Sequence, residues 1–556
     1  MSNRRVKAAT ASEMATRQRD ISVSEFFLKN RHLLGFDTPS KALVTAVKEA
    51  VDNSIDACEE AGILPHIVIE VSHHHGVCRI AVEDNGPGIV EGQIARIYGK
   101  LLYGSKFHKL AQSRGQQGMG ISAAGMYGQL TVGKPLHILS RVEGEEQASE
   151  MVVSIDTKRN RPDIHRRTRI DWDRPHGTRV EMAIEGHPQQ GPHSVESYLK
   201  LTAIANPHVT LEYVPPDGGR IAFLRSVYEL PPRPAEIKPH PEGVELGRLI
   251  QMLGSTESRT LLKFLVDEFS SIGRKTASAI VDKAGGRLSA RSYPKHIARA
   301  QATALHRAIR RTPIPAPRTD CIVPVGEDLL LAGLHKELEA DFYTATTRPA
   351  AAYQGNPFQV EVALAYGRPG EADIEVDSGG RMRKLDDPHK SISRHLIAGR
   401  NEPVRLLRFA NRVPLLYQQQ GCAITRAVTQ TNWRTYGLTQ HAGSLPVAPM
   451  AIIVHVASVW IPYTSEAKEA VEPYPEILRE IKLSLQQCGR DLAQYLRRRN
   501  RLQKEYGKRV YIEKYLPHIG LALQDILDLD DAERDRAVDR LDEVLHRTRT
   551  THGSDR

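Results

Sequence analysis

Residues 49–57 read EAVDNSIDA and lie inside a longer stretch, 38–62, that predicts one helix bounded by a capping threonine, an early proline and a final glycine. Glu49 and Asn53 are one turn apart, so they share a face of that helix. A glutamate can take a proton from an attacking water, and an asparagine amide oxygen can bind Mg²⁺. Taken alone, this spacing is also typical of a solvated helix face.

Further along the chain, strands at 66–72 and 77–84 are predicted to form a hairpin, and the second runs into DNGPGI (84–89). Asp84 at the strand end can accept the exocyclic amine of adenine, and Gly88 lets the base approach the backbone. An isolated DNG is more often a turn, but its place after the first motif favours a nucleotide site. The three histidines between the strands are expected to form a hairpin tip, not a metal site.

Two glycine-bearing segments follow, YGSK (103–106) and RGQQGMGIS (114–122). The first offers a hydroxyl and an ammonium group. In the second, glycines free backbone N–H groups to surround phosphates, and a helix expected to start near Ile121 adds its positive end. The spacing matches neither the P-loop nor the dinucleotide-binding fingerprint. It therefore indicates a phosphate-binding loop of another kind.

The composition narrows the class of protein. Lys and Arg number 76 and Asp and Glu 66, so the formal charge is 76 − 66 = +10, which favours a polyanionic partner such as nucleic acid. Hydrophobic residues make up 40%, as in ordinary folded proteins, and no apolar run is long enough to span a membrane. The N-terminus does not resemble a secretory signal, and the five cysteines are scattered without a CxxC pair. We expect a soluble protein of a reducing cytoplasm, without disulfides or a cysteine zinc site.

The pattern of elements along the chain predicts several domains of an α/β multidomain protein. Strand candidates after the second proline-rich connector include 358–367, 406–417 and 450–461. The expected parts are a mobile tail at 1–20, an α/β domain at 21–230, an all-helical domain at 231–311, a second α/β domain at 312–472 with an insertion at 371–403, and C-terminal helices with a tail at 473–556.

EAVDNSIDA, DNGPGI, GQQGMG and the later HGT (176–178) resemble the successive motifs of the Bergerat-fold ATPases, which include gyrase B subunits, MutL proteins, heat-shock chaperones and histidine kinases. A finer resemblance, over about residues 22–515, is to the B subunit of topoisomerase VI, a type IIB DNA topoisomerase. The segments that carry it, in the family's order, are FFLKNRHLLGF, KLLYGSKFH, KPHPEGV, LVDEFSSIG, AYQGNPFQVEVALAYG, RFANRVPLLY and NWRTYG. It implies a Bergerat-fold α/β sandwich, a helix-two-turn-helix insert, an α/β transducer and C-terminal helices.

The resemblance also implies roles for individual residues. Glu49 would be the general base and Asn53 the Mg²⁺ ligand, with Asp52 standing where many relatives have glutamate. Asp84 and Gly88 would read adenine. Thr178 would support them. The ATP phosphates would be held by Ser105, Lys106, Gly115, Gln116, Gln117, Gly118, Met119, Gly120, Ile121 and Ser122.

A lysine from the second α/β domain would complete the site. Lys468, in IPYTSEAKEAVE (461–472), stands where the family has the lysine that reaches the γ-phosphate. Without the resemblance, a surface lysine opening a helix would be the simpler interpretation. Arg434 in NWRTYG is the alternative cation, although Trp433 and Tyr436 beside it favour packing.

By resemblance, two chains would dimerise through their ATPase domains when ATP binds and would trap double-stranded DNA without reading its sequence. The C-terminal end would dock an A subunit that carries the DNA-cleaving tyrosine, giving an A₂B₂ heterotetramer associated with the nucleoid. Candidate DNA-contacting residues, which an ordinary solvated helix surface would explain equally well, are Arg274, Lys275, Arg287, Arg291, Lys295, Arg299, Arg497, Arg498, Arg499, Lys504, Lys508 and Arg509.

Two other functions fit parts of the sequence. One is a chaperone or mismatch-repair clamp of the same ATPase class with no topoisomerase partner. The other is a DNA-binding scaffold whose nucleotide site has lost its activity. The joint presence of Glu49, Asn53 and Lys468 argues against the second.

Overall fold

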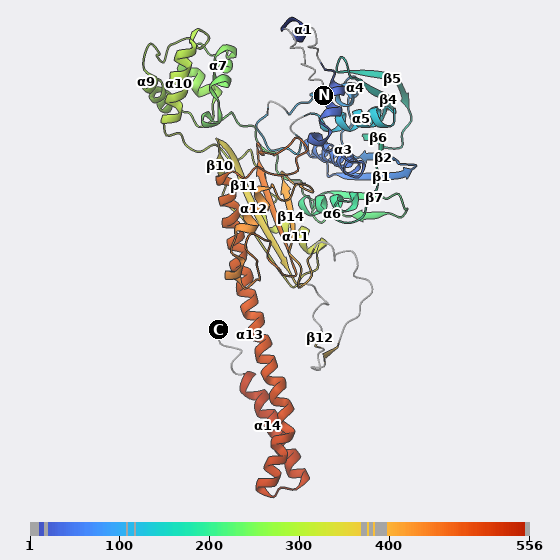
Figure 1. Cartoon of the computed structure of the whole chain (residues 1–556), viewed down its shortest axis with the longest axis vertical. Helices are drawn as coiled ribbons and strands as arrows, with labels where there is room; N and C mark the ends of the chain where they lie inside the picture. The colour runs from blue at the N-terminus through green and yellow to red at the C-terminus, as the bar shows by residue number, and fades with distance from the viewer. Residues whose placement is uncertain are drawn as a thin grey trace, which may run out of the picture. The chain divides into compact units, whose positions relative to one another are not determined.

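The computed structural model describes residues 11–15, 21–106, 109–115, 118–367, 375–376, 382–383 and 397–550 (Figure 1). The chain forms two compact units. One consists of Met1–Arg434 and Leu438–Cys488, and the other of Thr435–Gly437 and Gly489–Arg556. All the sheets and the candidate site lie in the first unit.

The helix expected at 38–62 is α3, Pro39–Ala61. The Thr38 hydroxyl accepts a hydrogen bond from the Lys41 N–H at its start, and Gly62 ends it in the left-handed conformation with φ of 79°. Its apolar stripe enters the core, where Leu43, Val47, Ala50 and Val51 are buried. The opposite side carries the polar residues of the first motif.

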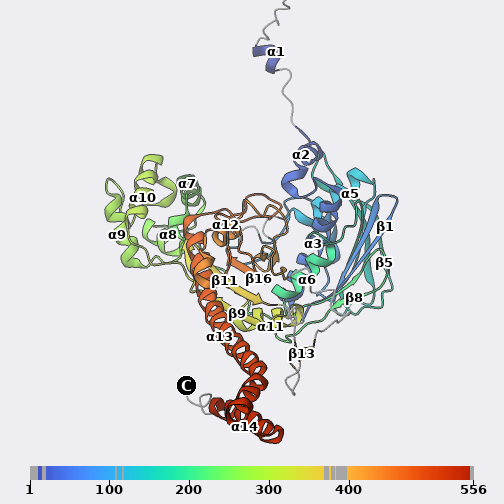
Figure 2. The same ribbon diagram turned by 60° about the horizontal axis from the view of Figure 1, so that its bottom comes forward.

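The first α/β layer contains an eight-stranded sheet in the order β5-β4-β3-β6-β2-β1-β7-β8. The expected hairpin is confirmed as β1 (His66–His74) antiparallel to β2 (Val77–Asp84). Helices α3, α5 (Gly120–Thr131) and α6 (Val195–Ala205) lie along one face of the sheet (Figure 2). The other strands are β3 (Leu136–Arg141), β4 (Ala148–Asp156), β5 (Arg161–Ile170), β6 (Gly177–Glu185), β7 (Thr210–Val214) and β8 (Ile221–Phe223).

The all-helical part has a hydrophobic core of its own. Leu249, Phe264, Leu265, Ile280 and Leu305 are fully buried within it. It consists of α7 (Leu246–Ser255), α8 (Leu261–Glu268), α9 (Arg274–Ala284) and α10 (Arg299–Arg311). These four helices lie within the stretch that the sequence predicts to be all-helical.

The second sheet has the order β10-β11-β16-β14-β15, with β9 paired to β11. Its members are β9 (Phe342–Thr347), β10 (Ala351–Tyr353), β11 (Asn356–Tyr366), β14 (Arg405–Ala410), β15 (Val413–Pro414) and β16 (Met450–Ser458). The strand expected at 406–417 is therefore wrong in part, because a tight turn at Asn411–Arg412 splits it into the β14–β15 hairpin. Helix α11 (Glu327–Glu337) packs beside the sheet.

Helix α6 contributes to both α/β layers. Tyr198 and Leu199 belong to the core under the first sheet. Leu201, Ile204 and Ala205 belong to a second core with Ala363, Leu407 and Ile453 of the other sheet. The packing of one helix on both sides is what brings residues of the second sheet to the cavity described below.

The remaining features are helical or peripheral. Helix α13 runs from Pro475 to Leu527 and α14 from Asp531 to Thr550, while α12 covers Ala423–Gln430. Most of the 371–403 insertion and most of the tail at 1–20 lie outside the described residues. All five cysteines are buried, and none of them forms a disulfide. In the described part of the chain no helix is both long and apolar enough to cross a membrane.

Candidate nucleotide site

One cavity of about 530 Å³ gathers the residues that the sequence motifs predict. Gln116 and Gln117 lie outside the described residues. Arg434 does not line this cavity. The predicted residues that do line it are Glu49, Asn53, Asp84, Gly88, Ser105, Lys106, Gly115, Gly118, Met119, Gly120, Ile121, Ser122, Thr178 and Lys468.

Asp84, the last residue of β2, is held by three hydrogen bonds. Its Oδ2 accepts from the Ser54 hydroxyl at 2.8 Å. Its Oδ1 accepts from the N–H groups of Gly86 at 2.9 Å and Thr178 at 3.2 Å. Burial raises the pKa of Asp84 to about 6, although these bonds favour the carboxylate. Ser54 is not among the residues predicted from the motifs; it stands in the first motif and faces Asp84 because α3 packs on β2.

Gly88 allows the backbone after β2 to pass close to β3. Its φ is 74°, and a Cβ there would lie 2.0 Å from the Arg141 carbonyl oxygen. Thr178 approaches from β6, where its Oγ1 is 3.0 Å from the Ser140 hydroxyl. Any side chain at Gly88 would therefore force the two segments apart and close the cavity at this end.

The catalytic-base candidate lies against the start of α5. A Cβ on Gly120 would be only 1.7 Å from Glu49 Oε2, so glycine is required for this approach. Helix α5 begins at Gly120 without a side-chain cap. The N–H groups of its first turn have no acceptor within the helix, so they can bind an anion. The Ser122 hydroxyl lies 3.0 and 3.1 Å from the carbonyl oxygens of Ile97 and Lys100 and can donate to either, which ties the first turn of α5 to residues 97–100.

Lys468 enters the same cavity from the segment after β16. Its Nζ donates to the Arg114 carbonyl oxygen at 3.2 Å and lies 3.9 Å from Glu49 Oε1. The residue is buried and stands in a turn with φ of 54°, not at the start of a helix. An unpaired surface lysine is therefore excluded.

The Lys468 segment is attached to α3 by its neighbours. Lys41 Nζ is 2.5 Å from Glu469 Oε1 and 2.9 Å from Asp37. Burial lowers the pKa of Lys41, but these two carboxylates outweigh it and raise the pKa overall. Lys48 Nζ is 3.4 Å from the Ala467 carbonyl oxygen. Lysines of α3 thus contact the residues on both sides of Lys468.

Lys106 and Asp56 form an ion pair at the rim, with Nζ 2.6 Å from Asp56 Oδ2. Burial disfavours the ammonium, yet Asp56 and Glu60 raise the pKa of Lys106 overall. The carboxyl group shows the reverse balance, since Lys106 and Arg114 outweigh burial and lower the pKa of Asp56. Any phosphate contact by Lys106 would therefore compete with these carboxylates.

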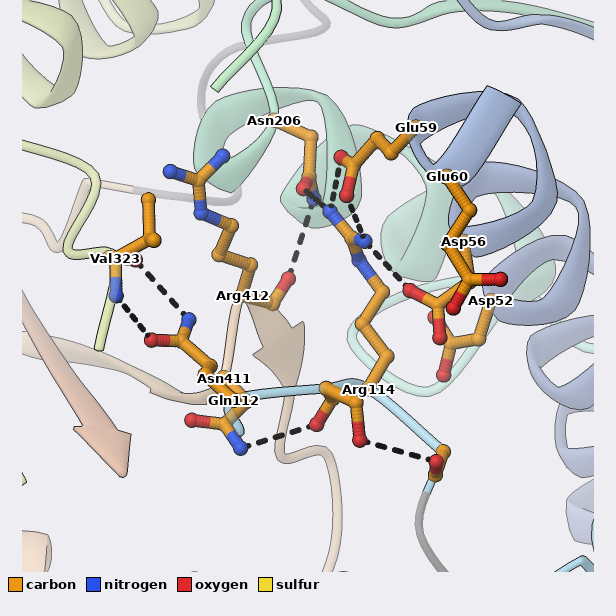
Figure 3. A network of polar contacts seen from close by, with 12 residues as sticks. Asp52, Asp56, Glu59, Glu60, Gln112, Arg114, Asn206, Val323, Asn411 and Arg412 are labelled. Carbon is orange, nitrogen blue, oxygen red and sulfur yellow. Dashed lines mark hydrogen bonds and ion pairs between the residues drawn. The ribbon is translucent and has the colours of Figure 1, made fainter. Parts of the chain in front are cut away.

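Arg114, at the start of the glycine loop, is the centre of a buried network that the sequence analysis missed (Figure 3). Its guanidinium donates to Asp56 and to both oxygens of Glu59 at 2.7 Å, and to Asn206 Oδ1 at 2.6 Å. Arg114 is 5% exposed. Only an arginine supplies this many donors in one plane. The position of Arg114 just before the glycine loop is the feature of the sequence that could have predicted this network.

Asp52 and Arg434 do not line the cavity, and each is held by contacts elsewhere. Asp52 is buried under α6, where the Tyr198 hydroxyl donates to it at 3.1 Å, and burial raises its pKa to about 6 although the nearby Lys48 lowers it. Arg434 donates from Nε and Nη2 to the Gln440 carbonyl oxygen at 2.8 and 2.6 Å. Trp433 donates its indole N–H to the Val428 carbonyl oxygen, so this segment is held by its own contacts.

Comparisons with known proteins give the class and then the family. Residues 41–174 match the model of the histidine kinase-, DNA gyrase B- and HSP90-like ATPases, and residues 317–508 match the topoisomerase VI B subunit transducer. The first match agrees with the cavity: a carboxylate at a strand end, a Glu-Asn helix face and a glycine loop at a helix start. The chain thus contains an ATPase domain of this class.

Two relatives identify the family. The B subunit of type 2 DNA topoisomerase 6 from Archaeoglobus fulgidus is 45% identical over 534 residues, covering 96% of this chain and 84% of the relative. That of Methanococcoides burtonii is 44% identical over 525 residues, covering 94% and 80%. The chain belongs to the family of type 2 DNA topoisomerase 6 B subunits. A crystal structure of the DNA gyrase B subunit of Myxococcus xanthus aligns with a TM-score of 0.40 at 12% identity, covering 84% of this chain and 95% of that one.

Proposed function

We propose that this chain is the ATP-binding and ATP-hydrolysing B subunit of a type IIB DNA topoisomerase. The observation that carries the proposal is the meeting of Glu49, Asn53 and Lys468 on one cavity with the glycine loop and Asp84. A general base, an oxygen ligand for a metal and a cation for the transferred phosphate are the three groups that ATP hydrolysis requires. Membership of the family supports the same conclusion.

At one end of the cavity, Asp84 would accept the exocyclic amine of adenine, and the Thr178 and Gly88 backbones would border the base. At the other end, the N–H groups of Gly118 to Ser122 would bind the phosphates with the positive end of α5. Ser105 and Lys106 would contribute from the rim. The depth of Asp84 and the mixed polar and apolar lining suit a base at one end and a polyanion at the other.

The site also fits Mg²⁺, because Asn53 presents an exposed amide on the cavity and Glu49 lies one turn before it. Amide and carboxylate oxygens are the ligands that this ion prefers, and substrate phosphates commonly complete its coordination. Asn53 would hold the ion. When bound, Mg²⁺ would neutralise charge on the phosphates.

Glu49 would take the proton from the water that attacks the γ-phosphate. Lys468 would stabilise the negative charge on the transferred group. To do so it would exchange the Arg114 carbonyl oxygen for a phosphate oxygen. This exchange would link the nucleotide to the segment after β16, and ATP would thereby favour one arrangement of the two sheets over another.

At the level of the whole molecule, ATP binding would join two chains through residues 21–230 and trap a double-stranded DNA segment. Residues 312–472 would act as the transducer, and 473–556 would dock an A subunit in an A₂B₂ assembly. Exposed cations of the helical part at 231–311 offer sequence-independent phosphate contacts: Arg274, Lys275, Arg287, Arg291, Lys295 and Arg299. Such an enzyme would work on the DNA of the nucleoid.

The test is an activity assay on the assembled enzyme. The chain is purified with the A subunit of the same organism and mixed with supercoiled DNA, ATP and Mg²⁺. We expect relaxation that depends on ATP, and its loss in Glu49→Ala with nucleotide binding retained. ATP hydrolysis without relaxation would instead favour a chaperone or mismatch-repair clamp, and absence of both would favour a binding scaffold.

A further inference from the structure

The β14–β15 hairpin has an unusual tip. Asn411 and Arg412 connect the strands with φ values of 48° and 66°, so both are left-handed although neither is glycine. Both residues are also buried, at 2% and 5% exposure. A left-handed arginine is rare outside positions where the surroundings impose it, and such positions cluster at functional sites. The contacts of Asn411 and Arg412 account for this left-handed backbone.

Asn411 joins the second sheet to the glycine-loop segment of the first. Its Nδ2 donates to the Ser113 carbonyl oxygen at 3.0 Å and to the Ser458 carbonyl oxygen at 2.9 Å. Its Oδ1 accepts from the Ser458 N–H at 2.9 Å. One buried amide therefore ties Ser113 to the end of β16, and both its nitrogen and its oxygen are hydrogen-bonded.

Arg412 reaches the same segment by a second route. Its carbonyl oxygen accepts from Asn206 Nδ2 at 3.2 Å, and Asn206 Oδ1 accepts from Arg114. Its N–H donates to His455 Nε2 at 2.9 Å, and the other nitrogen of His455 lies 2.6 Å from Glu361 of β11. Its guanidinium donates to the Pro324 carbonyl oxygen. Burial lowers the pKa of Arg412 to about 10, so it stays charged near neutral pH.

The three residues before Gly115 are thus each held by a residue of the second α/β part of the chain, 312–472. Gln112 exchanges two side-chain hydrogen bonds with the Val323 backbone, at 2.7 and 3.0 Å. Ser113 is held by Asn411, and the Arg114 carbonyl oxygen by Lys468. Of these contacts, the one by Lys468 would be given up when the lysine turns to a phosphate. The contact by Asn411 does not involve a group with a role at the nucleotide.

We propose that the Asn411–Arg412 tip is a positioning element that holds Ser113 directly and Arg114 through Asn206, and that it conveys the state of the phosphate-binding loop to β14 and β16, alongside Lys468. The inference rests on the proposed function. The contact of Lys468 with the Arg114 carbonyl oxygen would be lost when Lys468 turns to a phosphate. The contact of Asn411 with Ser113 would remain, so the phosphate-binding loop would stay connected to the second sheet before and after nucleotide binding. Packed networks of buried hydrogen bonds switch between two distinct arrangements more readily than they deform through a continuous range.

Asn411→Gly tests the proposal, because glycine accepts the left-handed backbone and removes only the amide. The matched control is Gln354→Gly, an exposed residue with φ of 45° in the β10–β11 turn of the same sheet. Arg412→Gly is a second comparison, since it keeps the backbone bonds to Asn206 and His455. Hydrogen–deuterium exchange is measured on the full chain with and without a non-hydrolysable ATP analogue.

Without nucleotide, we expect exchange of residues 109–115 to rise about fivefold in Asn411→Gly, the change that one net hydrogen bond supplies, and to stay unchanged in the control. With the analogue, residues 405–417 gain protection in the wild type, Gln354→Gly and Arg412→Gly but not in Asn411→Gly. Equal exchange of residues 109–115, or equal protection of 405–417, in Asn411→Gly and wild type overturns the proposal. If Asn411→Gly does not fold, Asn411→Ser carries the same test.

Hydrogen–deuterium exchange of residues 118–125 distinguishes a failure of this inference from a failure of the proposed function. Protection there by the analogue in all four proteins shows that the nucleotide site works and leaves the coupling as the only variable. If the analogue protects 118–125 in none of them, the proposed function fails and the inference falls with it. The comparison of residues 109–115 without nucleotide tests the positioning contact by itself.

Discussion

The ammonium of Lys468 lies 3.9 Å from the Glu49 carboxylate, although the two residues belong to different α/β layers of the chain. Glu49 is on α3 beneath the first sheet, and Lys468 follows the central strand of the second. Both side chains line the cavity that contains the glycine loop. The pair therefore joins the proposed proton acceptor to the element that would sense the γ-phosphate.

The ion pair between Lys41 and Glu469 should position Lys468, because it attaches the adjacent residue to α3. We expect Glu469→Gln to lower kcat for ATP hydrolysis about tenfold or more, in line with the sensitivity of catalysis to small displacements, and to change the Kd of an ATP analogue little. Lys263→Met, which removes an exposed pair with Asp267, is the control. Equal kcat in Glu469→Gln and wild type would contradict this role.

Gly120→Ala should abolish turnover. The added methyl would lie 1.7 Å from Glu49 Oε2, so the carboxylate must leave its position at the start of α5. We expect a loss of about a hundredfold or more in kcat, the size associated with a displaced catalytic group. Gly92→Ala is the matched control, because a Cβ there has no neighbour within 4 Å. Single-turnover hydrolysis measures both, and activity near wild type in Gly120→Ala would count against the placement of Glu49.

Arg114→Met should destabilise the first unit. It leaves Glu59 without its main charged partner and Asp56 with Lys106 alone, and removal of one member of a buried ion pair typically costs about 3–5 kcal/mol. Arg318→Met, at an exposed pair with Asp320, should change stability by less than about 1 kcal/mol. Urea denaturation followed by fluorescence compares the two. A similar, small shift in both variants would mean that the Arg114 network contributes little to stability.

The pKa of Asp84 predicts a pH-dependent effect of Asp84→Asn on stability. Burial raises that pKa from 3.8 to about 6, so folding favours the protonated form. The stability that this form contributes is fully present below pH 3.8 and is lost as the pH rises through about 6. The amide, which is never ionised, avoids the loss.

We therefore expect Asp84→Asn to gain stability over wild type as the pH rises from 4 to 6, and to keep an advantage of about 3 kcal/mol above it. Urea denaturation at pH 4.5, 6 and 8 measures the difference. Ser54→Ala, which removes only a neighbouring hydroxyl, serves as the comparison. An advantage that is the same at all three pH values would contradict the assigned pKa. Nucleotide binding in Asp84→Asn should be lost, because the amide NH₂ would point at the adenine amine that Asp84 is proposed to bind.

Much of the site follows from local sequence. The helix at 39–61 has its cap, first-turn proline and final glycine next to it in the chain, and the β1–β2 hairpin has an alternating pattern. Local pattern also predicts the start of α5, because glycines precede an apolar run. The motifs of the family add Lys468. The pattern misread 406–417 as one strand, since Arg412 stands where a tight hairpin turn usually has glycine after asparagine.

Local sequence therefore determined most of the helices and strands around the cavity, and local and family motifs together indicated the side chains proposed to carry the chemistry. Only the tertiary structure decided that Arg114 is held by Glu59, that Asn411 contacts Ser113, and that Lys468 donates to the Arg114 carbonyl oxygen. These contacts join residues far apart in the chain. They depend on α6 burying one face under each sheet, and the direction in which a distant side chain arrives is not encoded in the spacing of any single segment.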